Sequence, residues 1–284
     1  MKDVTVGVDG SETALAAVEW AADDAARRGA WLRIVHVVDR SPYELAASPE
    51  LDAALSEVAC RIMSGAEKTA RARRPGLPTR LENIEGRPAD VLRGLADESA
   101  GLVLGSRGMG RTAGSILGSV SMQVAGHSTG PVIIVPDRPR RRVGEIVVGL
   151  DDTADCHRPI SYAFEKADLH GAEIRALHAW SLPTHSYAPA IDYDLNTVRA
   201  GQRAVATSRL ARFRTRYPAL PVSDDLRSAH PVEALVEASR EADLVVVGAH
   251  GRGRADSIVM GSVSRRVLRH ARCPIAVVRP CGRH

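Results

Sequence analysis

Short apolar runs recur along the chain and alternate with stretches in which apolar residues keep helical spacing. In the first half the runs predict strands at residues 4–8, 31–38, 79–85, 101–105 and 131–135. The first predicted helix runs from Ser11 to Gly29. A second ends at Pro75, a third begins at Pro88 and a fourth begins at Ser119. The expected inward face of the second helix comprises Leu51, Leu55, Val58, Ile62 and Ala66. Nearly continuous apolar strands that alternate with helices are typical of a parallel sheet covered on both faces.

The same pattern occurs twice in the chain. Residues 146–151 match residues 4–9, and residues 274–278 match residues 131–135, with equivalent positions 142 or 143 residues apart. A period of this length indicates tandem duplication of a complete domain, because each copy can bury its own core. We therefore expect two α/β domains, at residues 1–137 and 143–284, joined by a basic linker at residues 138–142.

A glycine-rich loop follows the apolar run at residues 101–104. Its glycines are Gly105, Gly108 and Gly118, with two and then nine residues between them, and Ser119 follows directly. Without a Cβ atom the backbone can approach a ligand closely, and consecutive N–H groups can surround one anion. A helix that starts at Ser119 adds N–H donors and the positive end of its dipole. The pattern therefore predicts a phosphate cradle.

A second copy of this motif follows the apolar run at residues 244–247. It consists of Gly248, Gly251, Gly261 and Ser262, with the same spacing. One accidental match in a chain of this length has odds on the order of one in a hundred at ordinary residue frequencies. Two matches at equivalent places are far rarer, so turns alone explain these glycines poorly.

The remainder of the site is expected where strand order reverses. In a doubly wound sheet, ligands bind beyond the carboxyl ends of the strands at that point. If the order is 3-2-1-4-5, the ends of the first and fourth strands, at Asp9 and Gly105, flank the crevice. Asp9 could then bind ribose hydroxyls or the edge of the base, and the backbone around Val37 could contact adenine.

Other motifs fit the sequence less well. There is no Gly-x-x-x-x-Gly-Lys-Ser/Thr segment, and Gly105, Gly108 and Gly110 lack the spacing of a dinucleotide-binding loop. No Ser/His/Asp or Cys/His arrangement and no pair of carboxylates has a supporting motif. The four cysteines lie far apart without metal-ligand spacing. We therefore expect a binding protein without catalytic residues and without a metal held by its own side chains.

Composition narrows the setting in which the protein acts. The chain is 44% hydrophobic and 25% charged, as is ordinary for a globular protein. No apolar run approaches the roughly 20 residues needed to span a membrane, and residues 1–10 show no signal-peptide pattern. These features predict a cytoplasmic protein with reduced thiols. Much of the net charge of +4 lies in residues 137–142. The sequence shows no basic surface interleaved with aromatic residues, and this absence disfavours a nucleic-acid partner.

With these residues the chain resembles the universal stress protein family, in its tandem two-domain actinobacterial form. The family's signature is Gly-x2-Gly-x9-Gly followed by Ser or Thr, and both copies satisfy it. The resemblance covers essentially the whole chain. It implies an ATP-binding α/β fold with strand order 3-2-1-4-5. The ATP would bind in each domain, with or without Mg²⁺, and its bound state would alter the protein's surface or partners during stress.

The resemblance also assigns site residues. Asp9, with Gly10 beside it, and Val37 would contact adenosine. The residues that would hold ribose and phosphates are Gly105, Gly108, Gly118, Ser119 and Val120. The counterparts in the second domain are Asp151, Ala179, Gly248, Gly251, Gly261, Ser262 and Val263. Asp152 stands where the first domain has Gly10, and its charge would weaken the second site if it faces the phosphates.

Some of these positions have simpler explanations. His36 and His178 recur at one strand position, which favours hydrogen-bonded structural histidines. Trp180 and Tyr187 either cover a base or pack within the loop after a strand. Some family members are phosphorylated at such serines. Helix capping and ligand contact are the simpler roles for Ser119, Ser121, Ser262 and Ser264.

A nucleotide-binding regulator thus competes with two other functions. One is a slow ATPase or phosphotransfer enzyme, and the other is a scaffold that binds no nucleotide. The last strand of each domain, at residues 132–135 and 275–278, is a hydrophobic edge that needs a partner. We expect the two domains to pair edge to edge through these strands with pseudo-twofold symmetry, and the chains to form a homodimer.

Overall fold

The computed structural model describes residues 2–42, 48–108, 117–136, 143–151, 157–180, 194–249 and 260–279 of the chain. The N-terminal half contains β1 (Val4–Val8), α1 (Glu12–Arg28), β2 (Leu32–Val38), α2 (Pro49–Arg73), β3 (Thr79–Glu85), α3 (Pro88–Glu98), β4 (Gly101–Gly105), α4 (Ser119–His127) and β5 (Val132–Val135). The C-terminal half contains β6 (Glu145–Leu150), α5 (His157–His170), β7 (Glu173–Trp180), α6 (Leu195–Arg216), β8 (Val222–Ser228), α7 (Pro231–Ala238), β9 (Leu244–Gly248), α8 (Ser262–His270) and β10 (Ile275–Val278). The sequence repeat is therefore also a repeat of structure.

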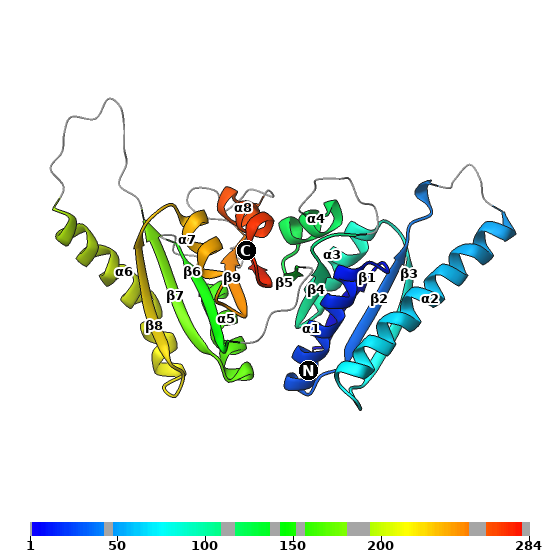
Figure 1. Cartoon of the computed structure of the whole chain (residues 1–284), viewed down its shortest axis with the longest axis horizontal. Helices are drawn as coiled ribbons and strands as arrows, with labels where there is room; N and C mark the ends of the chain where they lie inside the picture. The colour runs from blue at the N-terminus through cyan, green and yellow to red at the C-terminus, as the bar shows by residue number, and fades with distance from the viewer. Residues whose placement is uncertain are drawn as a thin grey trace, which may run out of the picture.

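All these strands form one sheet with the order β3-β2-β1-β4-β5-β10-β9-β6-β7-β8. Within each half the strands are parallel, and their order confirms the predicted 3-2-1-4-5. The halves join where β5 pairs antiparallel with β10, with Ile275 opposite Ile134 and Val277 opposite Val132. Figure 1 shows the halves side by side about this junction. The predicted edge-to-edge pairing is confirmed, and it fuses the two five-stranded sheets into one.

Two hydrophobic cores lie on opposite faces of the sheet. One contains residues of α1, α2, α5 and α6, and the other contains residues of α3, α4, α7 and α8. On β4, Val103 belongs to the first core, whereas Leu102 and Leu104 belong to the second. Helices on both faces explain why β1 and β4 are buried along their whole length. Each core includes residues of both halves, so the interiors of the halves are also joined.

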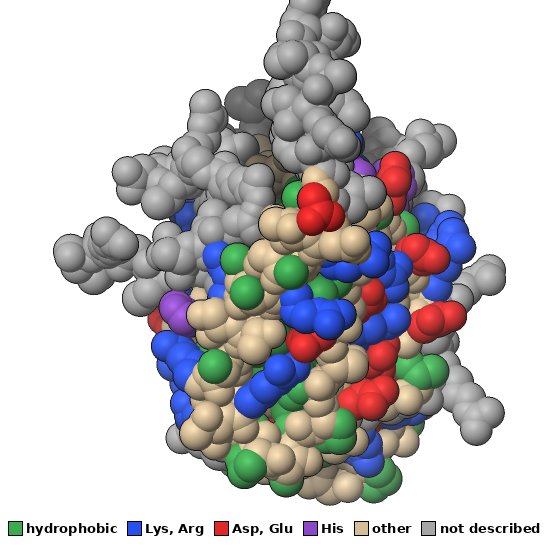
Figure 2. Space-filling view, turned by 90° about the vertical axis from the view of Figure 1, so that its left-hand side faces the viewer, with side chains coloured by type: hydrophobic (Ala, Val, Ile, Leu, Met, Phe, Trp, Pro, Cys, Tyr) green, Lys and Arg blue, Asp and Glu red, His purple; other side chains and the backbone are tan. Residues whose placement is uncertain are grey.

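The outer edge strands, β3 and β8, carry charged side chains where β5 and β10 carry apolar ones. On β8, Asp224 pairs with Arg214 (2.9 Å) and Asp225 pairs with Arg227 (2.8 Å). Figure 2 views the molecule from this end and shows basic and acidic side chains interspersed. Charged side chains on an edge strand discourage pairing with another chain. The two halves of the sheet therefore join through the apolar strands β5 and β10, and the sheet ends at the charged strands β3 and β8.

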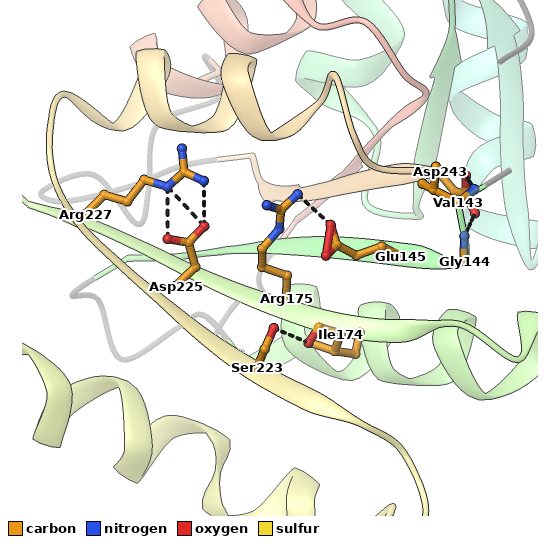
Figure 3. A network of polar contacts seen from close by, with 9 residues as sticks. All are labelled: Val143, Gly144, Glu145, Ile174, Arg175, Ser223, Asp225, Arg227 and Asp243. Carbon is orange, nitrogen blue, oxygen red and sulfur yellow. Dashed lines mark hydrogen bonds and ion pairs between the residues drawn. The ribbon is translucent and has the colours of Figure 1, made fainter. Parts of the chain in front are cut away.

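A polar network holds the strands of the C-terminal half together (Figure 3). Glu145, the first residue of β6, pairs with Arg175 of β7 at 2.5 Å. The carboxylate of Asp243, which precedes β9, accepts hydrogen bonds from the N–H groups of Val143 and Gly144 at 2.8 and 2.9 Å. These contacts lie at the amino ends of β6 and β9. They order the sheet without occupying the carboxyl ends of its strands.

Helix α1 has the predicted ends, whereas the inward face of α2 differs from the prediction. Ser11 caps α1 by accepting a hydrogen bond from the N–H of Ala14 (3.2 Å), and Gly29 ends it with φ of 61°. The buried positions of α2 are Ala59, Met63, Ala66 and Ala70. The expected inward residue Val58 is 37% exposed. Small alanine side chains let α2 approach the alanine-rich α1 closely, so close packing outweighs burial of the larger Val58.

Trp180 was wrongly predicted to lie in a loop. It is the last residue of β7, pairs with Ser228 of β8 and is buried. Tyr187 lies outside the described residues. The structural role expected for the two repeated histidines is confirmed. Nδ1 of His36 donates to the carbonyl of Val8 (2.8 Å), and Nδ1 of His178 donates to the carbonyl of Leu150 (3.3 Å).

Candidate functional site

The carboxyl ends of β1 and β4 meet at one edge of the sheet. Because β1 lies between β2 and β4, the chain leaves neighbouring strands in opposite directions, as at a topological switch point. Asp9 follows β1 and Gly108 follows β4, and a Cβ atom on Gly108 would lie 2.6 Å from Oδ2 of Asp9. The fold thus brings the predicted carboxylate and the predicted glycine motif into contact.

The start of α1 fixes Asp9 and the motif loop relative to each other. The N–H of Ser11 donates to Oδ1 of Asp9 (3.0 Å). Gly10 between them has φ of 88°, a conformation that L side chains rarely adopt. The hydroxyls of Ser11 and Thr13 both donate to the carbonyl of Arg107 in the motif loop. The carboxylate therefore sits in a rigid turn that is hydrogen-bonded to the loop.

Gly105 is glycine for a reason other than the one its motif suggests. A Cβ atom there would lie 2.7 Å from the carbonyl carbon of Thr13 and 2.9 Å from the backbone nitrogen of Ala14. The first turn of α1 therefore packs directly on the end of β4. Packing against the backbone of α1 is thus a reason for glycine at this position that the motif spacing does not indicate.

Gly118 is the opposite case. It precedes α4 with φ of −70° and ψ of 151°, which any residue can adopt. A Cβ atom there would meet the backbone only at ordinary contact distances, 3.6 Å from Cα of Arg107 and from the carbonyl oxygen of Ser106. Among the described residues, neither the conformation nor the packing requires glycine here. The missing side chain leaves space at the surface, where a ligand could approach the helix.

Helix α4 presents its first turn toward this space. Its N-cap is Gly118, so no side chain caps the helix, and the N–H of Gly118 itself donates to the carbonyl of Ser106 (2.8 Å). Ser119 is exposed and Val120 is half-buried. A helix N-terminus without a side-chain cap offers N–H donors and a positive dipole end to an anion. The motif therefore places an anion-binding helix start near the Asp9 carboxylate.

Ser121 fixes this helix to the strand before it. Its buried hydroxyl donates to the carbonyl of Gly105 at 2.8 Å. We expect Ser121→Ala to lower the free energy of unfolding by about 1–2 kcal/mol, because a buried carbonyl loses its donor. Urea unfolding followed by circular dichroism measures this. Ser119→Ala, at an exposed position of the same helix, should change stability by less than about 0.5 kcal/mol; equal losses in both variants would contradict the assignment.

The second half repeats much of this arrangement. Gly261 is the N-cap of α8 with φ of −60° and no side-chain cap, and its N–H donates to the carbonyl of Ala249 (2.8 Å). The hydroxyl of Ser264 donates to the carbonyl of Gly248 at 2.5 Å. As in the first half, Ser262 is exposed and the next residue, Val263, is half-buried. Gly251 and Asp152 lie outside the described residues.

The carboxylates of the two sites have different surroundings. Nη1 of Arg209 donates to the carbonyl of Asp151 and lies 3.8 Å from its Oδ1. Arg209 of α6 occupies the position that Ala66 occupies in α2. The two helices align because positions 59, 63, 66 and 70 of α2 have the same spacing as positions 202, 206, 209 and 213 of α6. A guanidinium thus lies beside the second aspartate where the first half has a methyl group. The two sites are chemically unequal.

Val37 and Ala179 lie near the carboxyl ends of β2 and β7, beside the ends of β1 and β6. Val37 follows His36, which pairs with Val8, so its backbone lies beside the end of β1. Ala179 holds the same position beside β6, and both residues are half-buried. The sequence analysis missed Thr13 and Arg209. Aligning the two repeats helix by helix would have shown the arginine opposite an alanine, whereas nothing local to Thr13 indicates its contact with the motif loop.

The described site combines a fixed carboxylate with a helix N-terminus. The first can accept hydrogen bonds from hydroxyl or amine groups, and the second can hold an anion. These features define a class: doubly wound α/β proteins with a glycine-rich motif before a helix N-terminus in each of two repeated halves. A profile of the universal stress protein family matches residues 1–136 and 143–279, and the chain belongs to this family.

Whole-chain comparisons agree with this assignment. Universal stress protein Rv1996 of Mycobacterium tuberculosis strain H37Rv is 33% identical over 302 residues, which cover 97% of this chain and 94% of the relative. Universal stress protein Rv2005c of the same strain is 35% identical over 287 residues, which cover 97% and 96%. The crystal structure of a universal stress protein from Archaeoglobus fulgidus DSM 4304 has a TM-score of 0.70 with 18% identity and covers 98% of this chain and 96% of that one. That structure shows a shared fold.

Within the described ranges, no helix combines the length and apolar character needed to cross a membrane.

Proposed function

We propose that the protein is a nucleotide-binding regulator that takes up one ATP in each half. The observation that carries the proposal is Gly118, the N-cap of α4, where neither the conformation nor the contacts among the described residues require glycine. A phosphate group that must approach the backbone gives this glycine a purpose. Asp9, which contacts the same loop, supplies an acceptor for the hydroxyl or amine groups of a nucleoside.

Two sets of residues would hold the nucleotide in the first half. Asp9 and the backbone of Val37 would face the nucleoside. Gly108, Gly118, Ser119 and Val120 would face the phosphates, with Gly10 and Gly105 shaping the backbone around them. In the second half the corresponding residues are Asp151, Ala179, Gly248, Gly251, Gly261, Ser262 and Val263. A bound Mg²⁺ would neutralise phosphate charge, and we propose it as a companion of ATP rather than an independently held ion.

The function proposed is regulatory and needs no turnover. The nucleotide would change the surface around α4 and α8, which lie next to each other at the centre of the molecule (Figure 1). We propose action in the cytoplasm, where ATP is available. Homodimerisation, also predicted from the sequence, would have to use another surface than β5 and β10, because these strands pair with each other.

The proposal is tested by denaturing purified protein and identifying the nucleotide released per chain, with and without EDTA. Gly118→Val places a branched side chain where the phosphates would approach, and we expect it to weaken binding at the first site at least about 100-fold, equivalent to about 2.7 kcal/mol. Gly261→Val should do the same at the second site. Each variant should therefore retain half the nucleotide, and the double variant none.

Gly65→Ala is the matched control, since a Cβ atom on this α2 glycine meets nothing within 4 Å. It should carry wild-type amounts of nucleotide. If the double variant binds as much ATP as the control, as measured by isothermal titration, the assigned site is wrong. If only one valine variant loses nucleotide, the other half does not bind it.

A further inference from the structure

A buried ion pair joins the two halves behind the β5–β10 junction. Lys166 of α5 and Asp24 of α1 are 0% and 1% exposed, and Nζ of Lys166 lies 2.5 Å from Oδ1 of Asp24. The two residues belong to different halves, so this contact exists only while the halves are paired. Among the described residues, Lys166 is one of the largest fully buried side chains.

The surroundings of the pair also come from both halves. His170 of α5 donates from Nε2 to Oδ1 of Asp24 at 3.0 Å, and Arg28 of α1 lies 3.3 Å from its Oδ2. The ammonium of Lys166 lies 5.1 Å from the centre of the Trp20 ring and 5.3 Å from that of the Tyr162 ring. Burial lowers the pKa of Lys166 to about 8 against the attraction of Asp24, so at pH 7 the lysine remains mostly protonated.

These residues occupy equivalent positions of the repeat. Asp24 and Lys166 are 142 residues apart, and the same spacing relates Trp20 to Tyr162 and Arg28 to His170. The ends of the two helices confirm the alignment, since Gly29 and Gly171, also 142 residues apart, both have φ of 61°. The pseudo-twofold axis of the molecule therefore passes between an acid and a base that duplication placed at the same position.

This geometry excludes pairing between halves of the same kind. Two N-terminal halves brought together about such an axis would place Asp24 against a second Asp24, and two C-terminal halves would place Lys166 against Lys166. Like charges buried at this distance repel strongly, and Arg28, which lies 3.3 Å from Oδ2 of Asp24 on the same helix, offsets only part of the loss of Lys166. Only an N-terminal half with a C-terminal half places opposite charges together.

The strands at the junction do not make this distinction. β5 has the sequence VIIV and β10 has IAVV, and both are buried along their length. Backbone hydrogen bonds and small apolar side chains would allow either strand to pair with a copy of itself. Within the sheet the two strands differ only in side-chain size, with Ile133 opposite Ala276. Discrimination by charge comes from side chains outside the sheet, and the charged side chains of α1 and α5 lie at the axis itself.

We propose that the surface of the N-terminal half formed by β5 and the Trp20–Asp24–Arg28 face of α1 is a selective docking surface for a C-terminal half, with the Asp24–Lys166 pair as the determinant that rejects a second N-terminal half. The partner it accepts is defined chemically: an apolar edge strand flanked by a helix that buries a cation. In the intact chain this partner is the chain's own C-terminal half. The pair thus favours pairing of β5 with β10 of the same chain over pairing with the β5 of another copy.

Charge reversal in the full-length chain tests the proposal. Asp24→Lys and Lys166→Asp each place like charges at the axis, and we expect each to open the junction, with a larger radius of gyration in small-angle X-ray scattering and a lower urea midpoint. The double variant Asp24→Lys/Lys166→Asp restores opposite charges in reversed order. It should recover most of the wild-type radius and midpoint, although each single change was harmful.

Glu165→Lys is the matched control, because it changes the charge by the same amount as Asp24→Lys at an exposed position next to Lys166. It should leave both measurements unchanged. If the single reversals fail to give soluble protein, recovery of soluble, monodisperse double variant supports the proposal equally. A double variant that is as damaged as the singles, or single variants with wild-type radius, would overturn it.

Discussion

Gly105→Ala is expected to destabilise the N-terminal half by about 3 kcal/mol, although it adds a single methyl group. The new Cβ atom would lie 2.5 Å from Oγ1 of Thr13, 2.7 Å from its carbonyl carbon and 2.9 Å from the nitrogen of Ala14. Two of these three atoms are backbone, so no side-chain rotation relieves the overlap. The first turn of α1 would have to move away from β4, and with it the hydroxyls that bind the motif loop.

Gly118→Ala is the matched comparison within the same motif. Its Cβ atom meets the nearest protein atoms at 3.6 Å, so we expect a stability change of less than about 1 kcal/mol, with any loss of nucleotide arising at the site itself. Urea unfolding followed by tryptophan fluorescence measures both variants, since Trp20 and Trp31 lie in the N-terminal half. Equal urea midpoints for the two variants would contradict the assignment of Gly105 to packing and of Gly118 to ligand contact.

Sequence periodicity was sufficient to predict the strands, whereas the order of the sheet followed from the resemblance to a known family. The inner strands are short and nearly continuous in apolar residues, so local pattern and tertiary burial agree there, whereas the edge strands β3 and β8 are polar and partly exposed. The repeat then predicted the junction, because two hydrophobic edges in one chain leave few other partners. The pattern failed for α2, where apolar residues occur on two sides of the helix. There, packing against α1 selects Ala59 and Ala66 and leaves Val58 exposed.

The residues of the candidate site were predictable from the sequence, but the contacts that explain each of them were not. Spacing identified the glycines, and the switch-point rule paired the motif with Asp9. Spacing could not show that Gly105 is needed by α1 and Gly118 is not, because that difference depends on atoms about 100 residues away in the chain. Nor could it show Arg209 beside Asp151, since an arginine in a helix is ordinarily expected in water.

The Asp24–Lys166 pair gives the second large expected effect. We expect Asp24→Asn to destabilise the protein at pH 7 by about 3–5 kcal/mol, because it leaves the ammonium of Lys166 buried without its counter-charge. Asp168→Asn, at an exposed position of α5, should change stability by less than about 0.5 kcal/mol. Replacing both members of the pair, as in Asp24→Leu/Lys166→Leu, should be far less harmful than Asp24→Asn, because no charge remains buried.

The loss of stability in Asp24→Asn should depend on pH. Burial opposes ionisation of Asp24, but Lys166, His170 and Arg28 outweigh it, so the pKa of this carboxyl lies below its ordinary value. A carboxyl whose folded pKa is lowered stabilises the fold above its unfolded pKa of about 3.9, and the stabilisation is lost as the pH falls below that value. In Asp24→Asn, Lys166 and His170 lose the attraction that raises their pKa values, so the cost of burying their charges grows as the pH falls. The difference in urea midpoint between wild type and Asp24→Asn should therefore widen from about pH 8 to about pH 5 and shrink again toward about pH 3, where Asp24 of the wild type is protonated. A difference as large at about pH 3 as at about pH 5 would mean that the stabilisation does not come from the ionised carboxylate of Asp24, and the ion pair would no longer explain how the halves are linked.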